Sequence, residues 1–156
     1  MWRTTPDIMP KWLSIKTIYE HNVRLYDHAG PGAWNDPDML EVGNGKLTEN
    51  ENRAHFSLWC MMAAPLILGN DVRKFVDGNN EQVRENPTLK IVTNKNLINI
   101  DQDRCASPAS AFAARPGWIF WPARCKTAMW PCACLTRAPP AARSPTTLTL
   151  WRTMRT

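Results

Sequence analysis

The run Gly30–Leu40 (GPGAWNDPDML) constrains the fold more than any other stretch of this 156-residue sequence. Glycine and proline at its start favour a tight turn, and Pro37 has no backbone N–H, so a strand that begins at Trp34 ends within a few residues. Asp36 and Asp38 are therefore expected at a strand end. Carboxylates beside an aromatic ring suit a sugar, because hydroxyls need acceptors and the C–H face needs an apolar wall. The same residues also suit an Asx turn, and the run alone leaves both interpretations open.

Two amphipathic patterns flank this run. Before it, apolar residues recur at three- and four-residue spacing, which predicts a helix over about residues 9–22. After it, the motif TENE beginning at Thr48 has the form of a capping box and predicts a helix over about residues 49–64, which Pro65 stops. His55 falls on the apolar face of this second helix, so we expect a packed or surface histidine and not a ligand.

The next segment, residues 66–71 (LILGND), has the pattern of a short apolar strand that ends in polar residues. Continuous apolar strands are typical of parallel sheets covered on both faces. A helix around Asn80–Glu85 and an apolar element over residues 97–100 are predicted after it.

Strand and helix thus alternate three times, which indicates an α/β protein, either a doubly wound sheet or a barrel. Polar residues follow three successive strands: Arg3 and Asp7, Asp36 and Asp38, Asn70 and Asp71. This favours a (β/α)8 TIM barrel, whose active site lies at the C-terminal ends of its strands. A complete barrel needs roughly 250 residues. We therefore predict an incomplete TIM barrel over residues 1–103, with about three of the eight strand–helix units.

The charge of the chain is unevenly distributed. The net charge of +5 would normally indicate nucleic acid or an anionic membrane as a partner. All fourteen acidic residues, however, lie at or before Asp103, and residues 104–156 carry eight Lys and Arg and no Asp or Glu. The basic character therefore belongs to this tail, and residues 1–103 are slightly acidic.

Several sequence signals are missing. No charged-then-apolar leader and no apolar run of about 18 residues occurs, so we expect neither a signal peptide nor a membrane span in this sequence, and the compartment stays unassigned. Cys60 is the single cysteine of residues 1–103, which argues against a disulfide framework there. The four tail cysteines have the wrong spacing for a zinc site.

Four motifs, in order and spacing, resemble the last third of the barrel in α-galactosidases (melibiases) of glycoside hydrolase family 27. They are WRTTPDI from Trp2, GPGAWNDPDMLEVGNG from Gly30, APLILGNDVR from Ala64 and NIDQD from Asn99. The resemblance covers residues 2–103. It implies a retaining exo-glycosidase that releases terminal α-linked galactose from oligosaccharides or glycoconjugates, with neither a metal nor an organic cofactor.

The resemblance also implies roles for individual residues. Asp7 matches the acid/base carboxyl, and Arg3 matches a donor to the galactose hydroxyls. Asp38 and Met39 match sugar-binding positions, and three neighbours match residues that support the strand end: Trp34, Asn35 and Asp36. The family's nucleophile is an aspartate on an earlier strand that this chain does not contain, so the chain alone is expected to be inactive. Pro6 stands where the family usually has Gly or Ala.

Two other functions compete with this interpretation. An α-N-acetylgalactosaminidase of the same family would differ in a loop that precedes Met1. A nucleic-acid-binding protein would use the tryptophans and arginines of residues 104–156 to stack on bases and contact phosphates. We expect neither a nucleic acid nor a membrane as partner, and the sequence assigns no oligomeric state.

The tail departs from the family pattern directly after Asp103, where Pro-Leu is usual and Arg104-Cys105 occurs. In a frame that starts at the third base of each codon, Trp118-Ile119 encodes Asp and Met129-Trp130 encodes Val, two residue types that the tail lacks. We therefore predict that residues 104–156 are the β-sandwich region of the family in a wrong reading frame. Such an aberrant tail should be non-native and disordered, without a coherent core.

Overall fold

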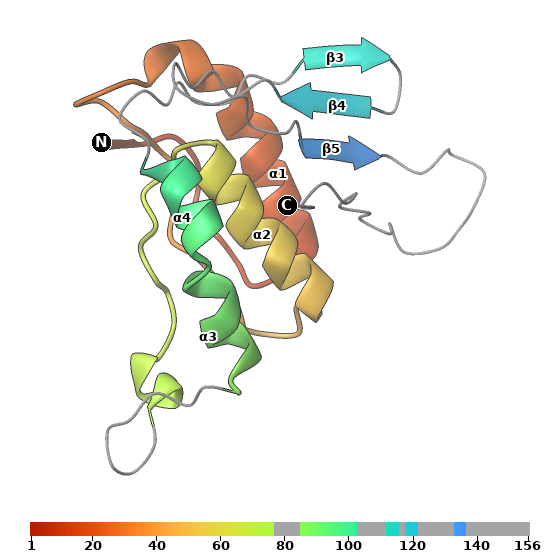
Figure 1. Ribbon diagram of the computed structural model, residues 1–156. Helices are drawn as coiled ribbons and strands as arrows, with labels where there is room; N and C mark the ends of the chain where they lie inside the picture. Colours follow the sequence, from red (N-terminus) through yellow and green to blue (C-terminus); the bar gives the residue numbers. More distant parts are fainter. Residues whose placement is uncertain (77–84, 103–111, 116–117, 122–132, 137–156) are drawn as a thin grey trace.

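The computed structural model describes residues 1–76 and 85–102, together with the backbone of 112–115, 118–121 and 133–136 (Figure 1). Helix α2 (Glu49–Met61) lies between α1 (Trp12–Asn22) and the pair formed by α3 (Pro87–Val92) and α4 (Lys95–Asp101). Two short strands, β1 (Trp2–Arg3) and β2 (Asn35–Asp36), run beside these helices.

The strands of this part are parallel. In the β1–β2 pair, Trp2 lies opposite Asn35 and Arg3 lies opposite Asp36. Farther on, Leu40 forms a parallel bridge with Leu68. Helix α1 connects the first pair and α2 connects the second, and parallel strands joined by helical crossovers are the repeating unit of α/β folds. The predicted alternation is confirmed to this extent, and closure into an eight-stranded barrel stays a prediction.

The predicted strand over residues 66–71 is wrong in its extent, because it pairs through the single bridge at Leu68. Beyond this bridge, side-chain amides replace a strand ladder. Asn44 Nδ2 donates to the carbonyl of Gly69 over 3.1 Å, and Asn70 Nδ2 donates to Asn44 Oδ1 over 3.3 Å. The loop after Leu40 thus holds the chain where a longer strand was expected.

The ends of the two long helices follow local chemistry. Helix α1 begins at Trp12, after the predicted start, because the chain is still extended at Lys11; it continues into a 3-10 helix, η1 (Val23–His28). Helix α2 begins with the predicted capping box. Thr48 Oγ1 accepts the Glu51 N–H at 3.3 Å, and Glu51 Oε2 accepts the Thr48 N–H at 2.7 Å.

Short helical elements follow Asn70. A second 3-10 helix, η2 (Val72–Phe75), follows it, and most of the predicted helix over residues 80–85 lies outside the described residues. Asn86 caps α3, and Pro87 occupies its first turn, where a missing N–H costs nothing. The apolar element over residues 97–100 is helical, because it lies within α4, whose first turn is capped by Asn94.

The core lies where α1, α2, α3 and the loop after β2 meet. Apolar side chains on facing surfaces of these elements are almost fully buried, and burial of this kind contributes about 25 cal/mol per Å² of apolar surface. These side chains include Ile15 and Ile18 of α1, Phe56 and Trp59 of α2, Leu40 and Val42 of the loop, and Ile91 of α3.

The tail contains a three-stranded antiparallel sheet in the order β3 (Phe112–Arg115), β4 (Trp118–Trp121), β5 (Ala133–Thr136). Aromatic and β-branched residues such as those of WIFW favour strands. The disorder expected of the tail stays a prediction. The predicted lack of a core in the tail concerns residues outside those described.

Two features of the described residues bear on partners. No helix there is long and apolar enough to cross a membrane. In the same residues, no group of three or more His, Cys, Asp or Glu side chains is arranged to hold a metal ion.

Candidate active site

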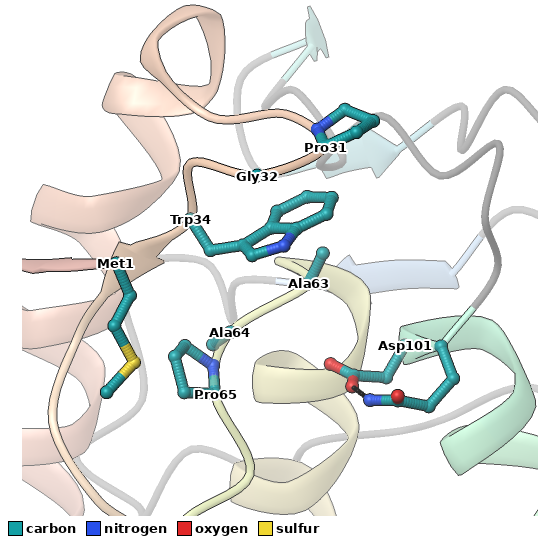
Figure 2. A pocket seen from close by; sticks show the side chains of 9 residues that line it. Met1, Pro31, Gly32, Trp34, Ala63, Ala64, Pro65 and Asp101 are labelled. Atoms are coloured by element: carbon teal, nitrogen blue, oxygen red, sulfur yellow. Dashed lines mark hydrogen bonds between the residues drawn. The ribbon is translucent and has the colours of Figure 1, made fainter.

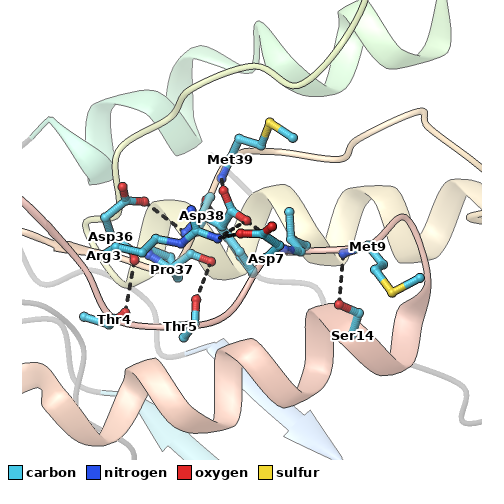
Figure 3. Close-up of polar contacts among 12 residues, drawn as sticks. Arg3, Thr4, Thr5, Asp7, Met9, Ser14, Asp36, Pro37, Asp38 and Met39 are labelled. Carbon is cyan, nitrogen blue, oxygen red and sulfur yellow. Dashed lines mark hydrogen bonds and ion pairs between the residues drawn. The ribbon is translucent and has the colours of Figure 1, made fainter.

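The chain segments that leave β1 and β2 bring three charged side chains together (Figure 3). Arg3 Nη2 donates to Asp7 Oδ1 over 3.0 Å and to Asp38 Oδ2 over 2.5 Å. One guanidinium nitrogen therefore binds two carboxylates that lie 31 positions apart in the sequence. Parallel pairing explains this arrangement, since it places the C-terminal ends of the two strands at the same edge.

The two carboxylates differ in their surroundings. Asp38 has a side chain that is 13% exposed, and both of its oxygens accept hydrogen bonds. Its Oδ2 accepts the Ile8 N–H over 2.7 Å, in addition to Arg3, and its Oδ1 accepts the Met39 N–H over 2.8 Å. The side chain of Asp7 is 99% exposed. One carboxylate is thus fixed by the backbone, and the other meets solvent freely.

Asn35 and Asp36 support this strand end. Asp36 Oδ1 accepts the Asp38 N–H over 2.9 Å, and the Asp36 carbonyl accepts the Thr4 N–H over 2.9 Å. Asn35 is buried, and its Nδ2 donates to the Leu25 carbonyl over 2.7 Å, which anchors β2 to η1. The supporting role that the resemblance implies for both residues stays a prediction.

Thr5 is a supporting residue that the sequence did not indicate. It is buried, and its hydroxyl donates to the Pro37 carbonyl over 3.0 Å, so it ties the segment after β1 to the segment after β2. A lone threonine between Thr4 and Pro6 has no distinctive pattern. The Arg3–Asp7 contact forms with Pro6 in place.

Met39 lies beside Asp38, and the residue is 38% exposed. Gly69 approaches it closely, because a Cβ at position 69 would lie 2.9 Å from Met39 Sδ and 2.8 Å from the Leu40 carbonyl oxygen. The absence of a side chain at Gly69 therefore makes room for Met39. At the predicted third strand end, Asp71 forms an ion pair with Arg73 over 2.8 Å, and Arg73 is not part of the Arg3 cluster.

The Trp34 ring lies elsewhere (Figure 2). It lines a pocket of about 650 Å³ together with Met1, Pro65 and Asp101, among others. None of the pocket's lining residues is Arg3, Asp7 or Asp38. The reason is position along the strand, since Trp34 precedes β2 and the carboxylates follow it. Trp34 supports the sheet through its backbone, where its carbonyl accepts the Trp2 N–H over 3.1 Å.

Asp101 at this pocket is unusual for a carboxyl. Its Oδ2 accepts Gln102 Nε2 over 2.5 Å, whereas its buried Oδ1 has no partner among the described residues. Burial raises the pKa of Asp101 to about 6. Cys60 is a free, buried thiol, and burial together with the Asp101 charge raises its pKa.

His55 is a packed residue, as predicted. It is 0% exposed, and burial lowers its pKa to about 3, so the ring is neutral at ordinary pH. Its Nε2 accepts the Glu41 N–H over 2.9 Å, which leaves Nδ1 to carry the proton. His55 therefore holds the backbone three residues after Asp38.

The sequence model of the family described as alpha galactosidase A (melibiase) matches residues 1–103. The chain belongs to this family. The alpha-galactosidase 3 of Arabidopsis thaliana is 48% identical over 102 residues, a match that covers 65% of this chain and 21% of that protein. The alpha-galactosidase of Oryza sativa subsp. japonica is 44% identical over 120 residues, 77% of this chain and 27% of that protein. That match extends past residue 103 into the tail.

Solved structures lead to the same family. Alpha-galactosidase I from Mortierella vinacea superimposes with a TM-score of 0.73 at 27% identity, over 86% of this chain and 37% of that chain. The Saccharomyces cerevisiae alpha-galactosidase in complex with raffinose gives a TM-score of 0.55 at 33% identity, over 69% of this chain and 24% of that chain. The chain spans about a fifth to a quarter of the length of the curated relatives that it matches.

Proposed function

We propose that residues 1–103 form part of a retaining exo-α-galactosidase and contribute its acid/base carboxyl and part of its sugar site. One observation carries the proposal: the Arg3 guanidinium joins an exposed carboxylate and a fixed one at the ends of two parallel strands, in a chain of the melibiase family. The raffinose bound to the Saccharomyces relative supports a galactosyl oligosaccharide as substrate.

Asp7 is the acid/base in this proposal. A retaining glycosidase needs one carboxyl that protonates the leaving glycosidic oxygen and then removes a proton from water. Full exposure allows the Asp7 carboxyl to reach a substrate oxygen, and Arg3 holds it near the second carboxylate. The nucleophile is an aspartate on another strand, outside these 156 residues, that attacks the anomeric carbon and forms a glycosyl-enzyme.

Asp38 and Met39 bind the sugar in this proposal. A carboxylate oxygen has two acceptor positions, and Asp38 Oδ1 uses one of them for the Met39 N–H, so a sugar hydroxyl can occupy the other. Arg3 donates to a neighbouring hydroxyl, and the partly exposed Met39 supplies an apolar contact. Asn35, Asp36 and the backbone of Trp34 support these groups from behind.

We further propose that residues 104–156 are the wrong-frame product of the region that follows the barrel in this family. The absence of acidic residues and the break after Asp103 support it. Sequencing the gene across the Asp103 codon tests it directly. A read with one base more or fewer than the present sequence is expected, and an unchanged read would contradict the proposal.

A graft tests the proposed activity. In this graft, residues 1–103 replace the matching stretch of the Arabidopsis alpha-galactosidase 3. We expect the graft to hydrolyse p-nitrophenyl α-galactoside and the 156-residue chain alone to show no turnover above background, because the covalent step needs a nucleophile. A graft that unfolds cooperatively yet is inactive, or turnover by the chain alone, would contradict the proposal.

A further inference from the structure

Asp38 has a backbone conformation that needs support. Its φ is 88°, in the left-handed region that residues other than glycine rarely adopt. The direction of its carboxylate depends on this conformation, because the side chain leaves the backbone at the same Cα. Whatever stabilises the Asp38 backbone therefore also fixes where its carboxylate points.

The support comes from one face of α2. Trp59 is 0% exposed, and its Nε1 donates to the Asp38 carbonyl over 2.8 Å. The His55 ring packs edge-on against the Trp59 ring, with centroids 4.2 Å apart and planes at 89°, and its Nε2 accepts the Glu41 N–H. These two residues are four positions apart, so they lie on the same helical face.

Asn52 extends this face by one turn. Its Oδ1 accepts the Gly43 N–H over 2.7 Å, and its Nδ2 donates to the Leu47 carbonyl over 3.2 Å. Successive backbone groups of the segment 38–47 thus find their partners on α2, at Trp59, His55 and Asn52 in order. The helix holds the segment at several points, and a shift at one of them would strain the others.

We propose that Trp59 and His55 are positioning residues of the sugar site: they fix the left-handed Asp38 backbone and so aim its carboxylate at the substrate. The inference rests on the proposed function. An apolar side chain of similar size could fill the same volume, but it would leave the Asp38 carbonyl or the Glu41 N–H buried without a partner. The backbone would then rotate to find one, and the carboxylate would turn with it.

Kinetics of the graft provide the first test. Trp59→Phe keeps an aromatic ring and removes the donor, and we expect KM for an α-galactoside to rise about tenfold, the equivalent of one hydrogen bond, with a smaller change in kcat. His55→Leu should act in the same direction. His55→Gln retains an acceptor for the Glu41 N–H and should restore most of the affinity.

The matched control is Trp12→Phe on α1, which changes a partly buried tryptophan packed against the same core. It should lower the Tm of the graft and leave KM unchanged. Equal KM values for the graft and its Trp59→Phe variant would overturn the inference. An equal rise in KM for the Trp12→Phe and Trp59→Phe variants would do the same, because it would indicate a general loss of packing.

Amide hydrogen exchange in the 156-residue chain supplies a second test that needs no catalysis. The Ile8 and Met39 N–H groups donate to the Asp38 carboxylate, so their exchange reports its position. Trp59→Phe should accelerate exchange at these two amides more than at amides within α1. Uniform acceleration, or none, would contradict the inference. If the graft is inactive but Trp59→Phe selectively accelerates exchange of the Ile8 and Met39 amides, the proposed function is refuted. The role of Trp59 in positioning the Asp38 carboxylate would then still stand.

Discussion

The two ends of β2 hold their carboxyl groups in opposite ways. After the strand, both oxygens of Asp38 accept hydrogen bonds, from Arg3, the Ile8 N–H and the Met39 N–H. Before it, the Trp34 pocket contains Asp101, whose buried Oδ1 has no partner among the described residues. A fully bonded carboxylate has a defined direction, which a binding site requires, whereas a buried carboxylate with one unpartnered oxygen costs stability when it ionises.

The largest effect on stability that we expect comes from His55 of α2, which supports the segment after Asp38. Because the folded-state pKa of His55 is about 3, below the ordinary 6.5, falling pH protonates the unfolded chain first. Stability should therefore decrease from about pH 6.5 to pH 3, by roughly 4 kcal/mol in total. Urea unfolding at several pH values measures this decrease.

The His55→Gln variant is the control for this decrease, since glutamine does not titrate. The difference in unfolding free energy between the chain and this variant should change steadily across the acidic range. A constant difference from pH 7 to pH 4 would show that His55 is not buried in the neutral form.

Asp101 should produce a smaller effect of opposite sign. Its folded-state pKa of about 6 lies above the ordinary 3.8, so the unfolded chain releases its proton first as pH rises. The stabilising contribution of protonated Asp101 is fully present below about pH 4 and is lost by about pH 6. This lowers the free energy of unfolding by roughly 3 kcal/mol. Asp101→Asn preserves the size of the side chain and should remove this dependence. If the variant retained the same pH dependence, the pocket carboxyl would not be its source.

Helix α2 supports the segment that follows β2, so a weaker first turn of α2 should also loosen that segment. Thr48→Ala removes the hydroxyl of the capping box and should lower the unfolding free energy by about 1 kcal/mol. Exchange of the Glu41 amide, bonded to α2, should accelerate more than exchange in α1. Thr17→Ala, at an exposed position within α1, is the control and should have almost no effect on stability. Equal losses for the two variants would contradict a stabilising cap.

The sequence predicted those parts of the fold whose signals are local. The capping box at Thr48, the helix after it and the strand end before Pro37 depend on neighbouring residues, and the structure confirms them. The strand over residues 66–71 failed because hydrogen bonds from Asn44 and Asn70, far apart in sequence, replace its ladder. The hydrophobic pattern alone does not predict that side-chain amides compete with the strand ladder for these hydrogen bonds.

The candidate site shows the same division. Arg3, Asp7 and Asp38 could be named from motifs, and the structure brings them together. The Trp34 ring was expected beside the carboxylates of Asp36 and Asp38. Trp34 precedes β2, however, so it lies at the opposite end of this strand from the residues that follow it. The roles of Thr5 and Trp59 were not predictable, because both act on distant carbonyl groups, through bonds that only the folded chain creates.

The proposed acid/base role of Asp7 predicts a loss of activity in the Asp7→Asn graft that depends on the leaving group. Raffinose has a poor leaving group that needs a proton, whereas an activated aryl galactoside does not. We predict that kcat/KM falls by about 10² to 10⁴ on raffinose and far less on the aryl substrate. Equal losses on both substrates would contradict the account, because they would show that Asp7 does not protonate the leaving oxygen.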